Sequence, residues 1–262
     1  MLTRKMTSLQ HPHIKHLVKL RENRDYRYRS QSVVICGFKL ISELARQFHF
    51  YSLILEEGID VEFEFTTQNL YFATPKMIKK ISGLEQPEPI LAEIPMPKAQ
   101  EISFANFLLI LDGISDPGNL GTLLRSARGL GWDAVFLTPG STDPFNDKAL
   151  RAAKGATFTM PWRTGTLEEL SVLIKNKNMK LFAADAKGTD LSTFHFTQPL
   201  ALALGNESHG LNSKLKEISE WIAIPMEKQM ESLNVSSAGA ILMYELRKSG
   251  QGPENLLRTQ EV

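Results

Sequence analysis

Residues 107–128 read F-L-L-I-L-D-G-I-S-D-P-G-N-L-G-T-L-L-R-S-A-R, and this stretch predicts the fold of the second part of the chain. Its opening residues are apolar on both faces, which is typical of a strand inside a covered, mainly parallel sheet. The glycines and the proline that follow predict a turn, and Asn119 can cap a helix expected over residues 119–130. A strand, a turn and a helix in this order predict an α/β architecture.

The same rhythm continues toward the C-terminus. Short apolar runs followed by polar or glycine-containing turns predict further strands at A-V-F-L-T, K-L-F-A-A-D, L-A-L-A-L and W-I-A-I. Helices are expected over residues 144–153, 166–177, 211–218 and 236–248. We therefore predict a mainly parallel α/β domain over residues 99–262.

Residues 1–98 are predicted to form a smaller α/β domain. Helical spacing of apolar residues occurs in H-P-H-I-K-H-L-V-K-L and F-K-L-I-S-E-L-A-R-Q-F, and strand-like runs are S-V-V-I-C-G, Y-S-L-I-L-E and N-L-Y-F-A. Thr74 and Pro75 can begin a further helix. Four prolines within residues 87–97 predict an extended linker or an edge strand, so the domain boundary is expected within residues 95–104.

Composition restricts the class of protein. The 262 residues suffice for one large or two modest domains, and no apolar run approaches the roughly 18–20 residues of a membrane span. The first residues lack the apolar segment of a signal peptide. The single cysteine, Cys36, excludes an internal disulfide framework and cannot anchor a zinc cluster by itself, so no metal is expected. These features favour a cytoplasmic protein, with a short organellar presequence as the alternative.

Positive charge is concentrated at the N-terminus. The chain carries a net charge of +1, but residues 1–29 contain eight Lys and Arg against Glu22 and Asp25, together with three histidines. The rest of the chain then balances to about −5, and a basic arm on a slightly acidic body suits contacts with phosphates. The alternative is a terminal helix whose charges only face solvent.

Polar loops follow the predicted strands at the edge where open α/β sheets bind ligands. The first loop leads into Arg125, and the second, L-G-N-E-S-H-G-L-N, places Asn206 and Glu207 between two glycines. These loops match neither G-x-G-x-x-G nor a P-loop. Their alternative readings are a capped helix with surface arginines and a glycine turn with a solvated glutamate.

The third loop spans residues 224–240, I-P-M-E-K-Q-M-E-S-L-N-V-S-S-A-G-A. It sets Ser232, Asn234 and Ser236 directly before a helix N-terminus, which offers free N–H groups and a positive dipole end. A plain N-cap explains one of these polar residues but not all three.

In order and spacing, the three loops resemble the signature of the SpoU-type RNA 2′-O-ribose methyltransferases of the SPOUT superfamily. The family motifs look like D-P-G-N-L-G-T-L-L-R, L-G-N-E-S-H-G-L, and I-P-M followed by E-S-L-N-V-S. The likeness covers residues 104–248, and the N-terminal part is similar to the small L30e-type α/β RNA-binding domain common in this family. Two departures bear on substrate details: L-R-A-A-K-G-A stands where a Ser-containing segment is frequent, and Ser237 where an aliphatic residue is common.

The resemblance implies a SPOUT α/β-knot fold, with a deep trefoil knot formed by the C-terminal segments, and a homodimer. It implies S-adenosylmethionine as the cofactor, contacted by Gly205, Asn206, Ile224, Met226 and Leu233. It implies that Arg125 is essential, acting as a base or as a stabiliser of phosphate and alkoxide charge. It implies that Arg125, the ribose and the loops are positioned by four polar residues: Asn119, Glu207, Ser232 and Asn234. Residues expected to contact RNA are Arg21, Arg24, Arg27, Arg128, Arg151 and Lys154.

The reaction implied is methyl transfer to a ribose 2′-hydroxyl of RNA. A structured rRNA loop is the expected substrate, with tRNA second, because sequence-specific readers of RNA mostly target loops. One alternative is a catalytically inactive RNA-binding or ribosome-assembly protein on the same fold. Another is a nucleotide-dependent enzyme of Rossmann type, against which the missing glycine fingerprint argues. The residues give Glu231 no role.

Overall fold

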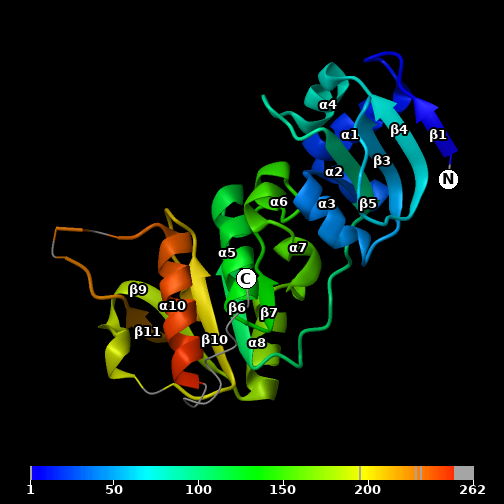
Figure 1. The fold of residues 1–262 in the computed structure, drawn as a ribbon. Coiled ribbons are helices and arrows are strands. Elements are labelled where there is room, and N and C mark those ends of the chain that lie inside the picture. Colours follow the sequence, from blue (N-terminus) through cyan, green and yellow to red (C-terminus); the bar gives the residue numbers. More distant parts are fainter. Residues whose placement is uncertain (1, 195, 228, 231, 251–262) are drawn as a thin grey trace. The chain divides into compact units, whose positions relative to one another are not determined.

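The computed structural model describes residues 2–194, 196–227, 229–230 and 232–250 (Figure 1). The chain divides into two compact units, Met1–Lys98 with Phe145–Leu150, and Ala99–Pro144 with Arg151–Val262. In the described part of the chain, no helix is both long and apolar enough to cross a membrane.

The first unit contains a sheet in the strand order β1-β4-β3-β5-β2. Its strands are β1 (Leu2–Lys5), β2 (Ser32–Cys36), β3 (Phe50–Glu56), β4 (Thr67–Ala73) and β5 (Ile90–Pro95). Its helices are α1 (Pro12–Glu22), α2 (Arg24–Ser30), α3 (Phe38–Ala45) and α4 (Pro75–Ser82). β4 pairs in parallel with β1 and β3, whereas β5 runs antiparallel to β2 and β3. The apolar stripe of α1, Ile14, Leu17 and Leu20, is fully buried in the core of this unit.

The expected linker or edge strand at residues 87–97 is instead an interior strand. β5 lies between β2 and β3 and pairs with both. Pro87 and Pro89 precede the strand, Pro97 follows it, and Pro95 is its last residue. Because every proline lies outside the strand or at its end, the missing N–H groups do not interrupt the ladder.

The basic N-terminal segment is not an arm. Residues 2–5 form β1, which pairs with β4, and the Met6 N–H donates to the Phe72 carbonyl at 2.8 Å. Met6 itself is buried, and α1 and α2 follow directly. The sequence reading missed β1 and α2, since a four-residue strand and a helix rich in arginine carry little apolar periodicity.

The second unit contains a sheet in the order β11-β9-β10-β6-β7-β8, with every pairing parallel. Its strands are β6 (Phe107–Asp112), β7 (Ala134–Leu137), β8 (Trp162–Thr164), β9 (Lys180–Asp190), β10 (Leu200–Gly205) and β11 (Glu220–Ala223). The strands β6 and β7 are buried along their whole length, which confirms the predicted covered parallel sheet. The trefoil knot that the resemblance implies stays a prediction.

Helices of this part of the chain fall close to the expected ranges. They are α5 (Pro117–Gly129), α6 (Asp147–Ala153), α8 (Leu167–Lys177), α9 (Ser213–Glu217) and α10 (Val235–Gly250). The short helix α7 (Ala156–Thr159) and a 3₁₀ turn at Leu191–Thr193 were not predicted. One expected cap is wrong. The carboxylate of Asp116, not the amide of Asn119, caps α5, and it accepts the Asn119 N–H at 2.9 Å. The side chain of Asn119 is thereby available for other contacts.

Helix α10 packs closely against α5 and β10 at Gly239. A Cβ atom at this position would lie 2.5 Å from Leu123 Cδ2 and 2.6 Å from Leu204 Cδ1. The small residue therefore sets how near the helix approaches the sheet.

We expect Gly239→Ala to lower the free energy of unfolding of the second unit by about 1–3 kcal/mol, because two leucines must shift. Tryptophan fluorescence during urea unfolding measures this unit alone, since Trp132, Trp162 and Trp221 all lie in it. The matched control is Gly129→Ala, also in a helix, whose added Cβ meets nothing within 4 Å. Equal effects of the two substitutions would contradict the close packing.

Candidate active site

A cavity of about 410 Å³ lies in the second unit, at the carboxyl ends of β10 and β11. Its walls come from β9, the loop after β10, the loop after β11 and the first turns of α10. Apolar walls are supplied by Leu204, Ile222 and Leu242. Among the described lining residues, Asp185 and Glu207 are the charged ones, so the cavity wall carries two carboxylates and neither lysine nor arginine.

The residues expected to hold a cofactor all line this cavity: Gly205, Asn206, Ile224, Met226 and Leu233. So do three of the residues expected to act in catalysis: Glu207, Ser232 and Asn234. Asn119 and Arg125 do not belong to the described lining. The structure therefore brings the second and third loops to one cavity and leaves Arg125 outside it.

The second loop folds tightly over the end of β10. A Cβ atom on Gly205 would lie 2.4 Å from backbone atoms of both Gly210 and Leu211, so only glycine fits there. The backbones of Asn206 and Gly210 exchange N–H···O bonds of 3.1 and 2.9 Å. Backbone rather than side chain thus forms this part of the cavity wall.

The amide of Asn206 ties the second loop to the first. Its Nδ2 donates to the Gly113 carbonyl at 2.7 Å, while its Oδ1 accepts the Ser208 N–H at 2.8 Å and the His209 N–H at 3.0 Å. Gly113 has a φ of +67°, which suits the turn after β6. Asn206 therefore shapes the loop with both ends of its side chain.

A chain of polar side chains connects all three loops. Asn119 Nδ2 donates to Glu207 Oε1 at 2.9 Å, and Asn119 Oδ1 accepts from Asn234 Nδ2 at 3.1 Å. The other carboxylate oxygen of Glu207 accepts from the Ser115 hydroxyl at 3.1 Å. Asn234 Oδ1 in turn accepts from the Ser236 hydroxyl at 2.6 Å. Each amide orientation is fixed by a donor on one side and an acceptor on the other.

Hydrogen bonding also sets the charge state of Glu207. Partial burial raises the pKa of Glu207, but hydrogen bonds from Asn119 and Ser115 outweigh burial and hold the pKa below its usual value. The carboxylate is therefore charged at physiological pH and is a poor proton acceptor. Its geometry and charge suit holding the loops together rather than removing a proton.

Two further residues of the first loop were missed by the sequence reading. Ser115 donates to Glu207, as described above. Asp112, buried at the end of β6, accepts from the Thr138 hydroxyl at 2.7 Å and from the Asn212 N–H at 2.6 Å. An ionisable residue directly after an apolar strand is the signal that could have singled out Asp112.

Arg125 lies on α5 with its side chain exposed. Its guanidinium makes no hydrogen bond or ion pair with another residue in the described part of the chain. An arginine held out to solvent in this way can bind a phosphate or a developing negative charge on a partner molecule.

The residues expected to contact RNA differ in exposure. Arg24, Arg128, Arg151 and Lys154 are exposed. The side chain of Arg21 is only 14% exposed, and its Nη1 donates to the Lys80 and Ile81 carbonyls at the end of α4. Glu231, for which no role was assigned, lies outside the described residues.

The prediction that Arg27 contacts RNA is wrong, because this residue is buried. This residue is 3% exposed, and its Nη1 donates to the Leu20 and Arg21 carbonyls at 2.6 and 2.7 Å. Because the guanidinium satisfies the carbonyls at the end of α1, Arg27 holds α2 against α1 and is removed from the set of candidate RNA contacts.

We expect Asn119→Ala to raise the pKa of Glu207, because the substitution removes a donor to its carboxylate. Because this pKa is lowered, the stabilisation from the hydrogen bonds to the Glu207 carboxylate is fully present above the usual pKa of a glutamate. It is lost as the pH falls through the lowered pKa. In Asn119→Ala this loss should occur at a higher pH. A carbon NMR titration of the Glu207 carboxyl measures the shift, with Ser126→Ala on the same helix as control. An unchanged pKa in Asn119→Ala would show that this hydrogen bond does not form in solution.

The sequence is similar to proteins of known class. Residues 106–244 match the SpoU rRNA Methylase family, and residues 11–92 match the MRM3-like substrate binding domain. The 23S rRNA (guanosine(2553)-2′-O)-methyltransferase RlmP of Bacillus subtilis is 31% identical over 249 residues, which cover 93% of this chain and 99% of that protein.

Solved structures agree with this similarity. An RNA 2′-O ribose methyltransferase has a TM-score of 0.81 at 28% identity, covering 94% of this chain and 98% of its own. The AdoMet-bound rRNA methyltransferase of Sinorhizobium meliloti shares the fold, with a TM-score of 0.81 at 24% identity over 94% of this chain and 98% of its own. With a family match over more than half of its length and a relative aligned along nearly all of it, the chain belongs to the SpoU rRNA methylase family.

Proposed function

We propose that this protein transfers a methyl group from S-adenosylmethionine to a ribose 2′-hydroxyl of ribosomal RNA. The observation that carries the proposal is the cavity at the ends of β10 and β11, whose wall is joined to α5 through Glu207, Asn119 and Asn234. Family membership supports the reaction, and the similarity to RlmP supports ribosomal RNA as the substrate.

The cavity fits a cationic cofactor better than a nucleotide phosphate. Its volume of about 410 Å³ lies within the range of small-molecule sites, roughly 300–1,000 Å³. S-adenosylmethionine carries positive charge on its sulfonium and ammonium groups, whereas NAD and ATP carry phosphates. The carboxylates of Asp185 and Glu207 complement the former and oppose the latter. This charge argues against the Rossmann-type alternative, and the AdoMet-bound structure of the same fold supports the cofactor.

When bound, the cofactor supplies an electrophilic methyl group. The residues of the chain shape the cavity and hold its polar groups in position. Gly205 brings backbone to the cavity, and Ile222 and Leu242 exclude water from it. Glu207 holds Asn119, and Asn119 holds Asn234 at the start of α10, so the wall keeps one geometry.

We assign Arg125 to charge stabilisation. A ribose hydroxyl is a poor nucleophile until its proton leaves, but a guanidinium is protonated at physiological pH and cannot accept that proton, which passes to solvent water instead. Its five N–H donors suit a phosphate of the RNA or the developing negative charge on the 2′-oxygen. Both roles require the exposed, unpartnered side chain described above.

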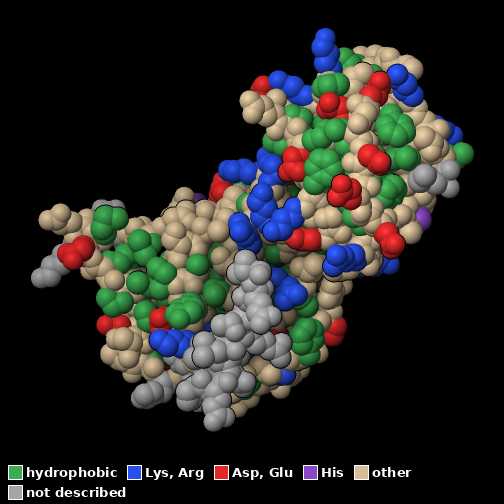
Figure 2. Space-filling view, viewed as in Figure 1, with side chains coloured by type: hydrophobic (Ala, Val, Ile, Leu, Met, Phe, Trp, Pro, Cys, Tyr) green, Lys and Arg blue, Asp and Glu red, His purple; other side chains and the backbone are tan. Residues whose placement is uncertain are grey.

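Two observations support a homodimer. Arg125 does not belong to the described lining of its own chain's cavity, which is consistent with an arginine approaching from a second subunit. Helix α10 also exposes Ile241 and Tyr244, whose exposed fractions are 41% and 48%. Figure 2 shows hydrophobic side chains gathered over the region of α10. We propose that α10 pairs with a second copy and that Arg125 of the partner subunit approaches the cavity.

We further propose that residues 1–98 bind RNA and residues 99–262 catalyse the transfer in the cytoplasm. The match of residues 11–92 to a substrate binding domain supports the first assignment. Exposed cations on α1 and α2 supply phosphate contacts, among them Lys15, Lys19 and Arg24. A non-catalytic RNA-binding protein on this fold is the competing function, and the methylation assay below separates the two.

We expect Arg125→Ala to lower the turnover number by about 10²–10³-fold while S-adenosylmethionine binds with unchanged affinity. The assay measures methyl transfer from labelled cofactor to rRNA of cells that lack this protein, with mapping of the 2′-O-methylated nucleotide. Calorimetry measures cofactor binding. Lys175→Ala, an exposed cation on α8, is the control. Full turnover in Arg125→Ala would remove this residue from the mechanism, and cofactor binding without transfer by the unaltered protein to any RNA would refute the methyltransferase function.

We expect Tyr244→Asp to convert the protein to a monomer, because a charge on the outer face of α10 cannot be desolvated in an apolar interface. Light scattering after size-exclusion chromatography measures the mass. Val172→Asp on α8, where the valine is 58% exposed, should leave the dimer intact. Unaltered protein that runs as a monomer at micromolar concentration would contradict the dimer.

A further inference from the structure

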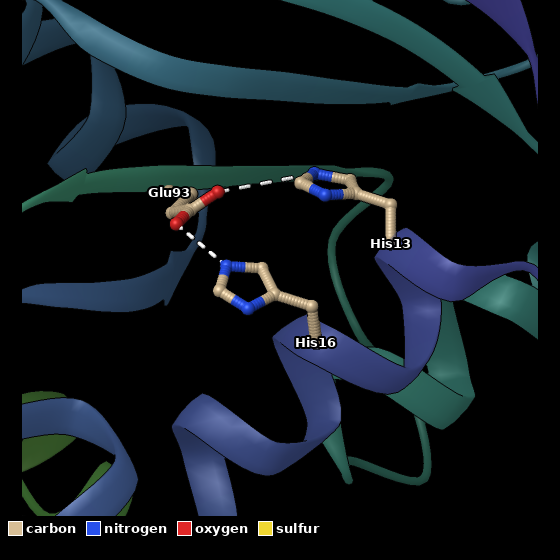
Figure 3. Close-up of side chains that lie close together, drawn as sticks. All are labelled: His13, His16 and Glu93. Atoms are coloured by element: carbon tan, nitrogen blue, oxygen red, sulfur yellow. Dashed lines mark hydrogen bonds and ion pairs between the residues drawn. The ribbon is translucent and has the colours of Figure 1, made fainter. Parts of the chain in front are cut away.

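A cluster of His13, His16 and Glu93 lies in the first unit and has no part in the proposed reaction (Figure 3). The two histidines are one turn apart on α1, and Glu93 comes from the interior strand β5. His16 Nε2 lies 2.8 Å from Glu93 Oε1. His13 Nε2 lies 3.9 Å from Glu93 Oε2 and 2.8 Å from the Ser52 hydroxyl oxygen. Both imidazole rings therefore face the carboxylate, and an ion bound at His13 Nε2 would replace the contact with Ser52.

Burial of the Glu93 carboxylate costs desolvation free energy. The side chain of Glu93 is 7% exposed, and it accepts from the Ser32 hydroxyl at 2.9 Å and the Ser52 hydroxyl at 3.3 Å. Apolar residues of similar volume stabilise a core as well as a buried polar network does, and often better. Packing alone therefore does not account for a buried carboxylate that faces two histidines.

We propose that His13, His16 and Glu93 form a binding site for Zn²⁺. Tetrahedral zinc with bonds of roughly 2.0–2.2 Å keeps its ligand atoms about 3.3–3.5 Å apart. The two nitrogen–oxygen separations, 2.8 and 3.9 Å, fall on either side of that value. One ligand atom from each residue lies within 4.8 Å of the others, so small side-chain rotations bring all three onto one ion.

The surroundings of the cluster suit ligand histidines. His16 Nδ1 lies 2.9 Å from the Tyr26 hydroxyl, and such an outer partner fixes the ring orientation of a metal-bound histidine. The ring of His13 stacks on Tyr71 with centroids 4.5 Å apart.

The ligand set selects the class of metal. Two imidazoles and one carboxylate favour zinc and other late transition metals over Mg²⁺ and Ca²⁺, which prefer oxygen ligands. The side chains of His13 and His16 are 17% and 26% exposed, so water can reach the fourth position. A bound ion would join α1 to β5 and stabilise the first unit. The expectation of a metal-free protein followed from the lone cysteine and did not consider these histidines.

The test is a titration of the untagged full chain with Zn²⁺, followed by calorimetry and by thermal unfolding. We expect saturable binding of one ion per chain and a rise in the unfolding temperature. His16→Ala and Glu93→Gln should each weaken Zn²⁺ binding by more than about tenfold. His49→Ala, which removes an exposed histidine outside the cluster, should leave binding unchanged.

Spectroscopy provides a second readout. Co²⁺ in place of Zn²⁺ should give the intense visible absorption of a four-coordinate site, and this absorption should be absent in Glu93→Gln. Glu93→Gln retains the shape of the side chain, and circular dichroism verifies that the variant is folded. Absence of saturable Zn²⁺ binding to the unaltered protein, or equal binding by Glu93→Gln, would overturn the proposal and leave a hydrogen-bonded cluster.

Discussion

The candidate site depends on one shared amide. Asn119 donates to Glu207 in the second loop and accepts from Asn234 in the third, while its own backbone lies in the first turn of α5. Loops that lie about ninety and more than a hundred residues apart in the chain thereby take one relative position. An ionised aspartate at this position could accept from Asn234 but could not donate to Glu207, whereas the carboxamide of Asn119 does both because it has a donor end and an acceptor end.

The charge of the cavity follows from the same arrangement. Glu207 is held as a carboxylate by its donors, and Asp185 adds a second negative charge to the wall. The exposed Arg125 on α5 does not belong to the described lining of that wall. Opposite charges are thus separated within one subunit, so that the cationic cofactor and the anionic RNA each meet a complementary surface.

Much of this architecture was accessible from the sequence. The strands of the second unit are short apolar runs between turns, and strict patterns of this kind determine element type well. The three loops were recognised from residue type and order, but their mutual contacts depend on rotamers that no local pattern encodes. Asn119 was expected to cap a helix, yet Asp116 caps α5 and releases it. The prolines around β5 led to the wrong prediction of a linker or edge strand. Whether a strand can contain or adjoin a proline depends on its hydrogen-bond register with two neighbouring strands, which the local sequence does not show. Arg27 was counted as a surface cation because charge alone does not reveal that carbonyls at the end of α1 need a donor.

The strand β1 has a consequence for the integrity of the first unit. It pairs with β4 at the outer edge of the sheet, and Met6, the residue that follows β1 in the chain, is buried. β4 would present an uncovered row of backbone donors and acceptors if these few residues were cleaved or displaced. Such an edge is a template for pairing with another chain. Residues 2–5 thus replace the seven-residue edge of β4 with a shorter, basic edge strand, which pairs less readily with another chain.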